Sequence, residues 1–294
     1  MRVPSQPIFP ALHAAVFKTP QGVPYLKEPG AVVVSQPLVD INALRPFLDQ
    51  FDPVLRFGEY VDDPTEVPAG TFLCKVAGQT CYCSWGEKRT MNDEARKYIA
   101  NIIESGHGSV LEHANYGLFL YGISRSLTHE LVRHRAGFAY SQVSQRYVDD
   151  TTLRFVMRPE YDGDPQLAPR FMSNIEHAAK EYREISDILE ARQEAGTEIL
   201  TGEKKRDRRK KVQQAARSVL PNETEAPVTV TANVRAWRHT LEMRASEHAE
   251  TEIRRLFMKI YQLLVQLDPI LFGDYVVVDL PDGTQCLHTD HPKV

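Results

Sequence analysis

The sequence has no long apolar run. None approaches the roughly 20 residues that cross a bilayer, which excludes a membrane-spanning helix. The N-terminus contains prolines and has no apolar segment followed by a small-residue cleavage site, so we expect no signal peptide. A basic excess is also absent, because the net charge is −4. We therefore expect a cytoplasmic protein without nucleic-acid or membrane partners, in which any anion binding is local.

Cysteine is scarce, with only four residues in the chain. Cys81 and Cys83 are separated by a single residue, which is not the usual metal spacing, and no second pair completes a site. The expected state is free thiols in a reducing compartment, and we predict no metal.

Alternating helix-like and strand-like patterns predict an α+β fold with a mixed sheet flanked by long helices. Helices are expected over residues 92–108, 124–135, 173–196, 202–221 and 233–267, and strands within 109–124, 223–233 and 274–287, with 146–159 extended. Asn92 is the expected cap of the first helix. Ser173 or Asn174 is expected to cap the third helix and Gly196 to end it, while Pro221 ends the fourth.

The first 70 residues are rich in Pro, Gly and Val and contain short strand-like runs. They predict irregular structure with edge strands and carry no recognisable chemistry. We therefore divide the chain into an N-terminal extension of unknown role, residues 1–70, and a single domain, residues 71–294.

Residues 133–147 concentrate functional side chains in the run RHRAGFAYSQVSQRY. Arg133 and Arg135 would point apart on a helix, so at a helix end they could hold two different anions. Arginine suits phosphate because its planar fork donates in pairs, and the loop from Gly137 to Ser144 offers backbone N–H groups and hydroxyls. A solvated basic helix end is the alternative interpretation.

Residues 106–113 contain His107, Ser109, Glu112 and His113. Two histidines and a glutamate are compatible with a metal site, but a third ligand at a suitable spacing is missing. A surface turn is the simpler interpretation.

Arg217 follows a helical run and has apolar neighbours, which predicts partial burial. A buried arginine needs an anionic partner. The preceding basic run at 204–211 is expected to be a solvated face.

The segment 233–267 reads as one long helix. On it, Asn233 and Arg244 would lie within about 20° of one face and roughly 16 Å apart along the axis. Trp237, Thr240 and His248 would share that face, which could line an elongated site. A helix packed at a subunit interface would show the same pattern.

Taken together, these segments resemble the flavin-dependent thymidylate synthases over residues 80–265. The family signature is Arg-His-Arg, seven residues, then Ser, usually followed by Arg-Tyr or Arg-Phe. Arg133-His134-Arg135 and Ser144-Gln145-Arg146-Tyr147 match it, as do GHGSVLEH, QQAARSVLP and the start of the 233–267 segment. The resemblance implies the family's fold and a homotetramer with sites at subunit junctions.

The resemblance also implies roles for individual residues. FAD contacts would come from His107, Ser109, Arg133, His134, Arg135, Gln142, Asn233, Val234, Arg235 and His239. The nucleotide would be bound by Glu130, Arg133, Gln142, Val143, Ser144, Gln145, Arg146, Arg217 and Arg244. Arg217 would reach the nucleotide of another subunit, and Arg244 would be catalytic, facing the uracil ring and favouring its N3-deprotonated form.

The implied reaction is reductive methylation of dUMP to dTMP. Methylenetetrahydrofolate would donate the carbon unit, and FAD reduced by NADPH would donate the hydride. Inward-facing arginines fit a pyrophosphate and a monophosphate on an acidic chain, and no cysteine nucleophile is required.

One departure separates this sequence from the family signature: eight residues, AGFAYSQV, lie between Arg135 and Ser144. The extra residue falls near Ala136 to Ala139, where Gly137 could absorb it as a bulge. It motivates two alternatives: hydroxymethylation of dUMP, or action on another pyrimidine nucleotide. A non-catalytic nucleotide-binding or RNA-binding protein is the alternative from another class.

Overall fold

The computed structural model describes residues 8–147, 150–196 and 205–292. A five-stranded sheet in the order β1–β4–β5–β8–β6 forms its centre, and all neighbouring strands are antiparallel. The strands are β1 (Ala11–Leu12), β4 (Gly30–Ser35), β5 (Asn115–Tyr121), β8 (Val228–Asn233) and β6 (Phe138–Gln142). The sheet therefore contains strands from both sides of residue 70, and the division of the chain into residues 1–70 and 71–294 stays a prediction.

Two smaller sheets complete the β structure. One contains β2 (Val16–Lys18), β3 (Pro24–Leu26) and β7 (Phe155–Val156), with β3 and β7 parallel. The other is a hairpin of β9 (Val276–Asp279) and β10 (Gln285–His288). The α+β class is confirmed. Parallel and antiparallel strand pairs occur together only in the small three-stranded sheet of the described residues, whereas the central sheet is entirely antiparallel.

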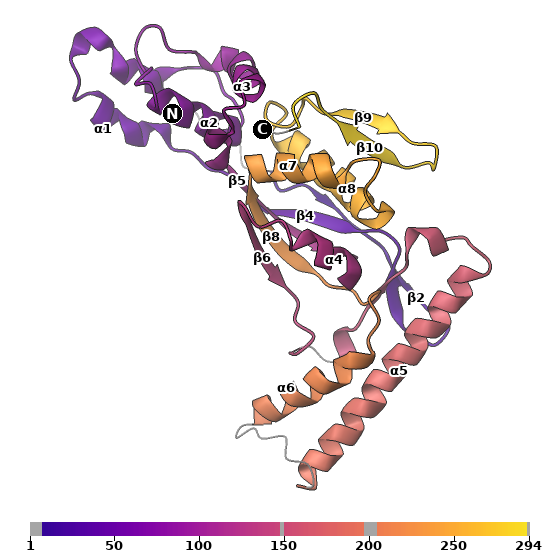
Figure 1. The fold of residues 1–294 in the computed structure, drawn as a ribbon. Coiled ribbons are helices and arrows are strands. Elements are labelled where there is room, and N and C mark those ends of the chain that lie inside the picture. The colour runs from indigo at the N-terminus through magenta and orange to yellow at the C-terminus, as the bar shows by residue number, and fades with distance from the viewer. Residues whose placement is uncertain (1–7, 148–149, 197–204, 293–294) are drawn as a thin grey trace.

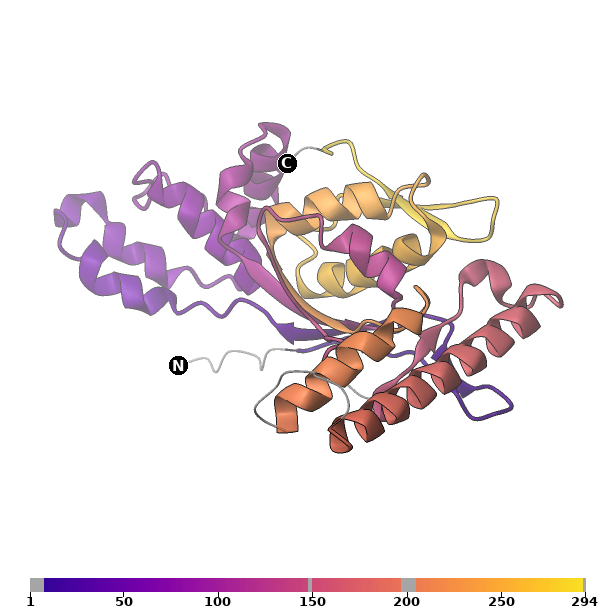
Figure 2. The same ribbon diagram turned by 60° about the horizontal axis from the view of Figure 1, so that its bottom comes forward.

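Eight α-helices pack around these sheets in the described residues (Figure 1). They are α1 (Arg45–Leu48), α2 (Ala69–Thr80), α3 (Ala95–Glu104), α4 (Arg125–Leu131), α5 (Leu167–Glu194), α6 (Lys205–Ala216), α7 (Val234–Arg244) and α8 (Thr251–Leu267). Short 3₁₀ helices join them, of which η5 (Gly108–Glu112) and η8 (Arg217–Val219) carry candidate residues. Figures 1 and 2 show α5 and α6 side by side, projecting away from the central sheet.

The core lies between the central sheet and the pair α7 and α8. Side chains alternate along a strand, so Leu118 and Leu120 of β5 share one face with Val228 and Val230 of β8. All four are fully buried, and Trp237 of α7 packs in the same cluster. At about 25 cal/mol per Å² of buried apolar area, this cluster is the main stabilising element of the fold.

The predicted single helix over 233–267 is wrong: the chain forms α7 and α8, separated by residues 245–250. No Gly or Pro breaks the helix. The carbonyls of the break are bonded from outside it: Leu287 N donates to Ala245 O (2.8 Å), and Arg254 Nη1 donates to Glu247 O (2.8 Å). His248 therefore does not continue the α7 face.

Trp237 and Thr240 belong to the core and not to a site wall, contrary to the prediction. Their polar groups are satisfied internally, because Trp237 Nε1 donates to Tyr116 O (3.1 Å) and Thr240 Oγ1 donates to Ala236 O (3.0 Å). A polar helix face can therefore be buried when each group finds a backbone partner.

The helix starts also differ from the prediction. Asn92 is buried beside Lys75 and does not cap α3, which begins at Ala95. Helix α5 begins at Leu167, ahead of Ser173 and Asn174; its N-cap is Gln166, and Asp164 accepts from Leu167 N (2.8 Å). Gly196 does follow α5, with a φ of +66°. Parts of the predicted extended stretch (148–149) and basic helix (202–204) lie outside the described residues.

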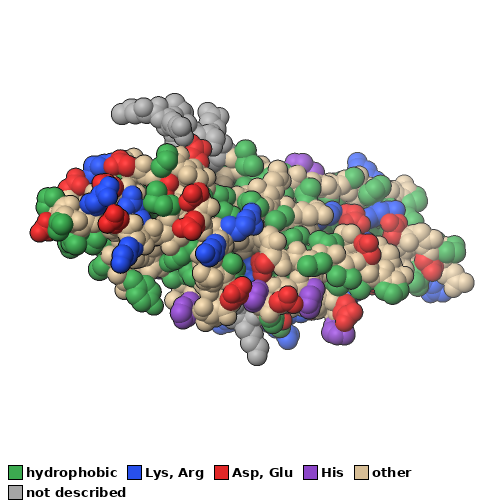
Figure 3. Space-filling model, turned by 90° about the horizontal axis from the view of Figure 1, so that it is seen from above, with side chains coloured by type: hydrophobic (Ala, Val, Ile, Leu, Met, Phe, Trp, Pro, Cys, Tyr) green, Lys and Arg blue, Asp and Glu red, His purple; other side chains and the backbone are tan. Residues whose placement is uncertain are grey.

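The face in Figure 3 carries acidic and basic side chains interspersed, without a large patch of one sign. None of the described helices combines the length and apolar character needed to cross a bilayer.

Candidate active site

Helix α4 is anchored at its start by a buried carboxylate from α8. Ser124 caps the helix, its Oγ accepting from Leu127 N (3.1 Å). Glu252 in turn accepts from both Ser124 N and Ser124 Oγ, each at 2.8 Å. Burial raises the pKa of Glu252, and the bonds from Ser124 oppose this shift. These two hydrogen bonds fix the start of α4 and therefore the direction of the helix toward the residues that follow it.

The Arg133-His134-Arg135 triplet lies just beyond the end of α4, in the turn that leads to β6. Tyr140 Oη lies 3.0 Å from Leu131 O and 2.9 Å from His134 O. Its hydroxyl therefore hydrogen-bonds carbonyl groups that have no partner within the helix end. Arg133 Nε donates to His129 O (3.1 Å). Among the described residues, neither Arg133 nor Arg135 has an acidic partner, which leaves both cations available to an anion.

Arg244, the last residue of α7, reaches across to this turn. Its Nε donates to His134 Nε2 (2.9 Å) and its Nη1 donates to Glu130 Oε2 (2.8 Å). The Arg244 side chain is 20% exposed and that of Glu130 is 39% exposed. The three residues from α4, the turn and α7 therefore form one connected group.

His134 is held neutral in this group. Burial, followed by the charge of Arg244 and the presence of His239, lowers its pKa to about 4. The His239 ring lies edge-on to it at 6.2 Å between centroids, and Phe138 lies 6.4 Å away. Its Nε2 accordingly acts as an acceptor.

A second group adjoins the first through α7 and η5. Arg235 Nη1 donates to Glu112 Oε1 (2.6 Å), and a Cβ on Gly108 would lie 2.8 Å from Arg235 Nε. Asn233 caps α7 by accepting from Ala236 N (2.9 Å), while its own N donates to Gly137 O (3.2 Å). The Gly108 backbone and the Arg235 side chain are thus in close approach.

The residues predicted to contact the cofactor differ in their solvent exposure. The exposed ones are His107, Ser109, Arg133, Arg135, Arg235 and His239. Val234 is fully buried and its N donates to Ala114 O (3.0 Å), so its side chain and N–H are used by the fold. Gln142 Nε2 donates to Thr128 Oγ1 (3.0 Å).

The predicted phosphate residues form a separate group beyond the end of β6. Val143, Ser144, Gln145 and Arg146 follow that strand, and Val143 and Gln145 line a cavity of about 530 Å³. Within the described residues, Arg146 Nε is buried without a hydrogen-bond partner. A buried guanidinium nitrogen of this kind calls for an acceptor.

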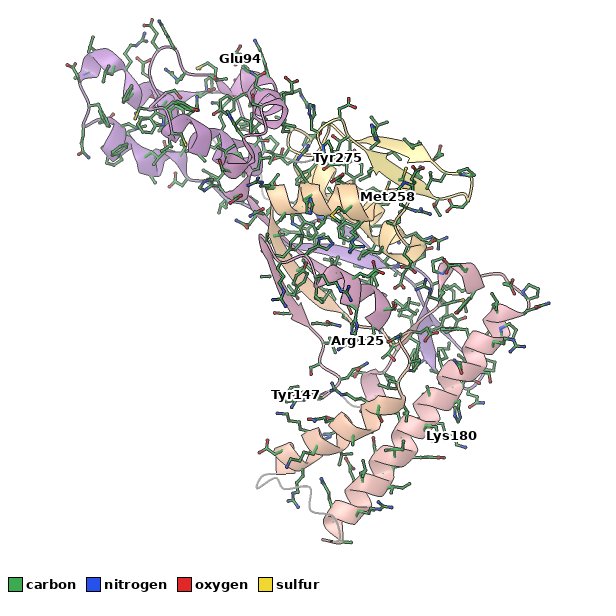
Figure 4. The ribbon with its side chains drawn as sticks, in the orientation of Figure 1. Glu94, Arg125, Tyr147, Lys180, Met258 and Tyr275 are labelled. Atoms are coloured by element: carbon green, nitrogen blue, oxygen red, sulfur yellow. The ribbon has the colours of Figure 1, made fainter. Side chains whose placement is uncertain are left out.

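Arg217 lies in η8, half-buried as predicted, near the start of α4. Burial, and then the charge of Arg217, hold the pKa of Arg125 below its usual range. Figure 4 shows Arg125 at the end of α4 nearer α6, with Tyr147 beside α6, where Lys210 Nζ lies 4.9 Å from its ring centroid. Neither Arg125 nor Arg217 has an acidic partner in the part of the chain described.

The structure thus brings Glu130, His134 and Arg244 together, but no contact among the described residues joins them to Arg146 or Arg217. No group of three metal-binding side chains occurs in the described ranges. All four cysteines are free.

The sequence alone did not identify Tyr140, Glu112 or Glu252 as site residues. Each acts by holding another residue: Tyr140 the triplet turn, Glu112 the Arg235 side chain, and Glu252 the start of α4. Glu112 lies in the candidate segment 106–113, but no local sequence pattern shows which arginine its carboxylate contacts.

Gly137 lies in the triplet loop with a φ of +75°, a backbone conformation that favours glycine, and its role in absorbing the extra residue stays a prediction. A Cβ there would lie 2.8 Å from both Asn233 Nδ2 and Ala236 Cβ. We expect Gly137→Ala to cost roughly 1–3 kcal/mol in unfolding free energy and to weaken flavin binding, since the turn must move. Urea unfolding and flavin titration measure the two effects.

Gly163→Ala is the matched control. Gly163 has a φ of +79° but nothing within 4 Å of the added Cβ, so it reports the backbone cost alone. Equal losses in the two variants, with flavin affinity unchanged, would contradict the predicted contact with Asn233.

Comparison with known proteins identifies the family of the chain. A family model described as "Thymidylate synthase complementing protein" matches residues 65–270. Flavin-dependent thymidylate synthase from Mycolicibacterium gilvum (strain PYR-GCK) is 43% identical over 226 residues, covering 76% of this chain and 87% of that protein. The Mycobacterium sp. (strain JLS) protein of the same name is 44% identical over 230 residues with the same coverage. The chain belongs to the flavin-dependent thymidylate synthase family.

Solved structures show the same fold at lower identity. The UMP/dUMP methylase PolB from Streptomyces cacaoi, bound with 5-Br dUMP, aligns with a TM-score of 0.55 at 18% identity. The alignment covers 84% of this chain and 94% of PolB. A second PolB structure, bound with 5-Br UMP, gives a TM-score of 0.52 at 19% identity, over 71% of this chain and 90% of that one.

Proposed function

We propose that this protein is a flavin-dependent thymidylate synthase that methylates dUMP to dTMP. Methylenetetrahydrofolate is the carbon donor and NADPH the reductant. The observation that carries the proposal is the Arg244 guanidinium, held by Glu130 and His134 at the triplet turn, whose Arg133 and Arg135 are exposed. Family membership supports the same reaction.

The donor set fits FAD. Arg133, Arg135, Arg235 and His239 are exposed on the triplet turn and α7, where cations and N–H donors suit a pyrophosphate. Gly108 leaves room that a Cβ would take up against Arg235. His107 and Ser109 add polar groups from the adjoining η5 segment. When bound, the reduced flavin supplies the hydride.

Arg244 is the residue we assign to the uracil. A guanidinium against a pyrimidine stabilises negative charge at N3 and its neighbouring oxygens, which favours the nucleophilic form of C5. Glu130 keeps the cation oriented through its 2.8 Å contact. No protein nucleophile is required in this scheme.

The nucleotide phosphate and sugar are assigned to Gln142, Val143, Ser144, Gln145 and Arg146. The buried, unbonded Arg146 Nε supports an anion at this place. Arg217 and its neighbour Arg125 form a second cationic point without a carboxylate in the described chain. We assign Arg217 to the nucleotide of another subunit, as part of a homotetramer.

The exposure of the flavin candidates supports such an assembly, since a partner subunit would cover them. The projecting α5–α6 pair supports it as well, because it offers helix surface away from the central sheet to a neighbouring subunit (Figure 2). Four free thiols support a cytoplasmic location, where thiols stay reduced.

The test is a product assay with purified protein, FAD, NADPH, methylenetetrahydrofolate and either dUMP or UMP. We expect flavin absorbance that follows the protein, and dTMP identified by mass. A product heavier than dTMP by one oxygen would indicate hydroxymethylation, and turnover of UMP alone would indicate a different nucleotide.

The non-catalytic alternative makes the opposite prediction. A protein that remains colourless after FAD is added, forms no product, and binds RNA in a fluorescence titration would replace our proposal.

A further inference from the structure

Arg244 is fixed at two of its three nitrogens. Nε donates to His134 Nε2 and Nη1 donates to Glu130 Oε2. The third nitrogen, Nη2, carries two N–H groups and has no partner among the described residues. Two bonds on different nitrogens define the plane of the guanidinium, whereas one bond alone would leave it free to swing.

The first of these bonds determines the protonation of His134. Arg244 Nε carries one hydrogen and is always protonated, so His134 Nε2 must present a lone pair. A protonated imidazole would place hydrogen against hydrogen and one cation against another. The ring proton therefore lies on Nδ1, which has no hydrogen-bond partner in the described chain and is available to a bound ligand.

We propose that His134 is a positioning residue. As the neutral Nδ1–H tautomer it accepts from Arg244 Nε and, together with Glu130, aims the free Nη2 edge at the pyrimidine. The tautomer and its contact are properties of the protein alone. The target of the Nη2 edge rests on the proposed function.

The energetics favour two contacts over one. A partly exposed ion pair such as Glu130 with Arg244 contributes little net stability, because its attraction is offset by the entropy lost in fixing the side chain. The bond to His134 adds a second constraint on a less flexible group, because Tyr140 holds the backbone of His134 through its carbonyl. A misplacement of about 1 Å in a catalytic group can lower a rate about 10²-fold.

The charged and titratable groups facing His134 agree with this assignment. Arg244 and His239 face it from α7, and Glu130 faces Arg244 from α4. The two α7 groups and burial act in one direction, which is to lower the pKa of His134. A folded-state pKa below the ordinary value keeps the ring neutral and accepting as pH falls from 7, until the pH reaches the lowered value.

The direct test is magic-angle-spinning NMR on protein labelled with ¹⁵N at its ten histidines. The signals missing from His134→Gln identify His134. We expect a protonated Nδ1 and an unprotonated Nε2 at pH 7, and the same form at pH 5.5, where an ordinary histidine is mostly charged. In Arg244→Ala the Nε2–H form should appear, because no donor faces Nε2.

The kinetic test compares His134→Ala with His134→Gln, whose side-chain oxygen can also accept from Arg244. We expect kcat per bound flavin to fall about 10²-fold in the alanine variant, and at least tenfold of that to return in glutamine. The dissociation constant of dUMP should change less than kcat in both.

The outcomes separate the inference from the proposed function. A wild-type protein that makes no dTMP but shows the Nδ1–H tautomer rejects the function and keeps the contact. A proton on Nε2 in the wild type, equal kcat values for the two variants, or losses that follow flavin content alone would overturn the inference.

Discussion

Replacing Arg244 with alanine is expected to lower kcat by about 10²–10³-fold while leaving flavin bound. Arg244 supplies the cation that we place against the uracil, and its charge matters most once the pyrimidine becomes negative. Its own contacts run to His134 and Glu130. No contact in the described residues joins it to the exposed side chains assigned to FAD (Arg133, Arg135, Arg235 and His239), so most flavin contacts and the flavin itself should remain. Steady-state turnover and the flavin absorbance per subunit measure the two parts of this prediction.

Arg255→Ala is the matched control for that experiment. Arg255 lies on α8 and forms a partly exposed pair with Glu28 (3.1 Å), so its loss should change stability slightly and turnover little. Near-normal turnover in Arg244→Ala would remove Arg244 from the mechanism. Complete flavin loss would make it a cofactor ligand instead.

Replacing Asp268 with alanine is expected to destabilise the fold by roughly 3–5 kcal/mol. Asp268 is fully buried at the end of α8 and accepts from Thr71 N (2.7 Å) and Thr71 Oγ1 (2.6 Å) of α2. It also accepts from Leu271 N (3.1 Å) and Tyr116 Oη (3.3 Å). Removing it leaves several buried donors without an acceptor, and each costs free energy. Denaturant unfolding monitored by circular dichroism measures the loss.

Two further variants interpret that loss. Asp268→Asn keeps one acceptor oxygen and should cost less than alanine. Asp290→Ala removes a carboxylate whose side chain is 90% exposed and should stay within about 0.5 kcal/mol of the wild type. An Asp268→Ala protein as stable as Asp290→Ala would show that the Asp268 bonds contribute no net stability.

Local pattern predicted much of the fold, because many elements follow from short-range rules. The strand expected within 109–124, from its apolar run, contains β5, and the strand expected within 223–233 contains β8. The site motifs were recognised by resemblance, and the family is confirmed. The residue roles that the resemblance implies stay predictions.

The misses arise where distant parts of the chain decide the local structure. Nothing in the sequence between Ala245 and Glu250 ends a helix; Arg254 and Leu287 do so by bonding its carbonyls. Trp237 was expected on a helix face that could line a site, but it is buried because Tyr116 O accepts from its Nε1. Trp237 and Tyr116 are 121 positions apart in the sequence, and a local sequence pattern cannot predict a contact over such a separation.

The bond from Leu287 N to Ala245 O has a consequence for the tail of the chain. The family match ends at residue 270, so the terminal hairpin belongs to a less recognisable part of the sequence. It nevertheless bonds the carbonyl of Ala245, the residue that directly follows Arg244 at the end of α7. Sequence change, truncation or a fused tag at the C-terminus can therefore affect the chemistry through the end of that helix, although no contact joins a described tail residue to the candidate site.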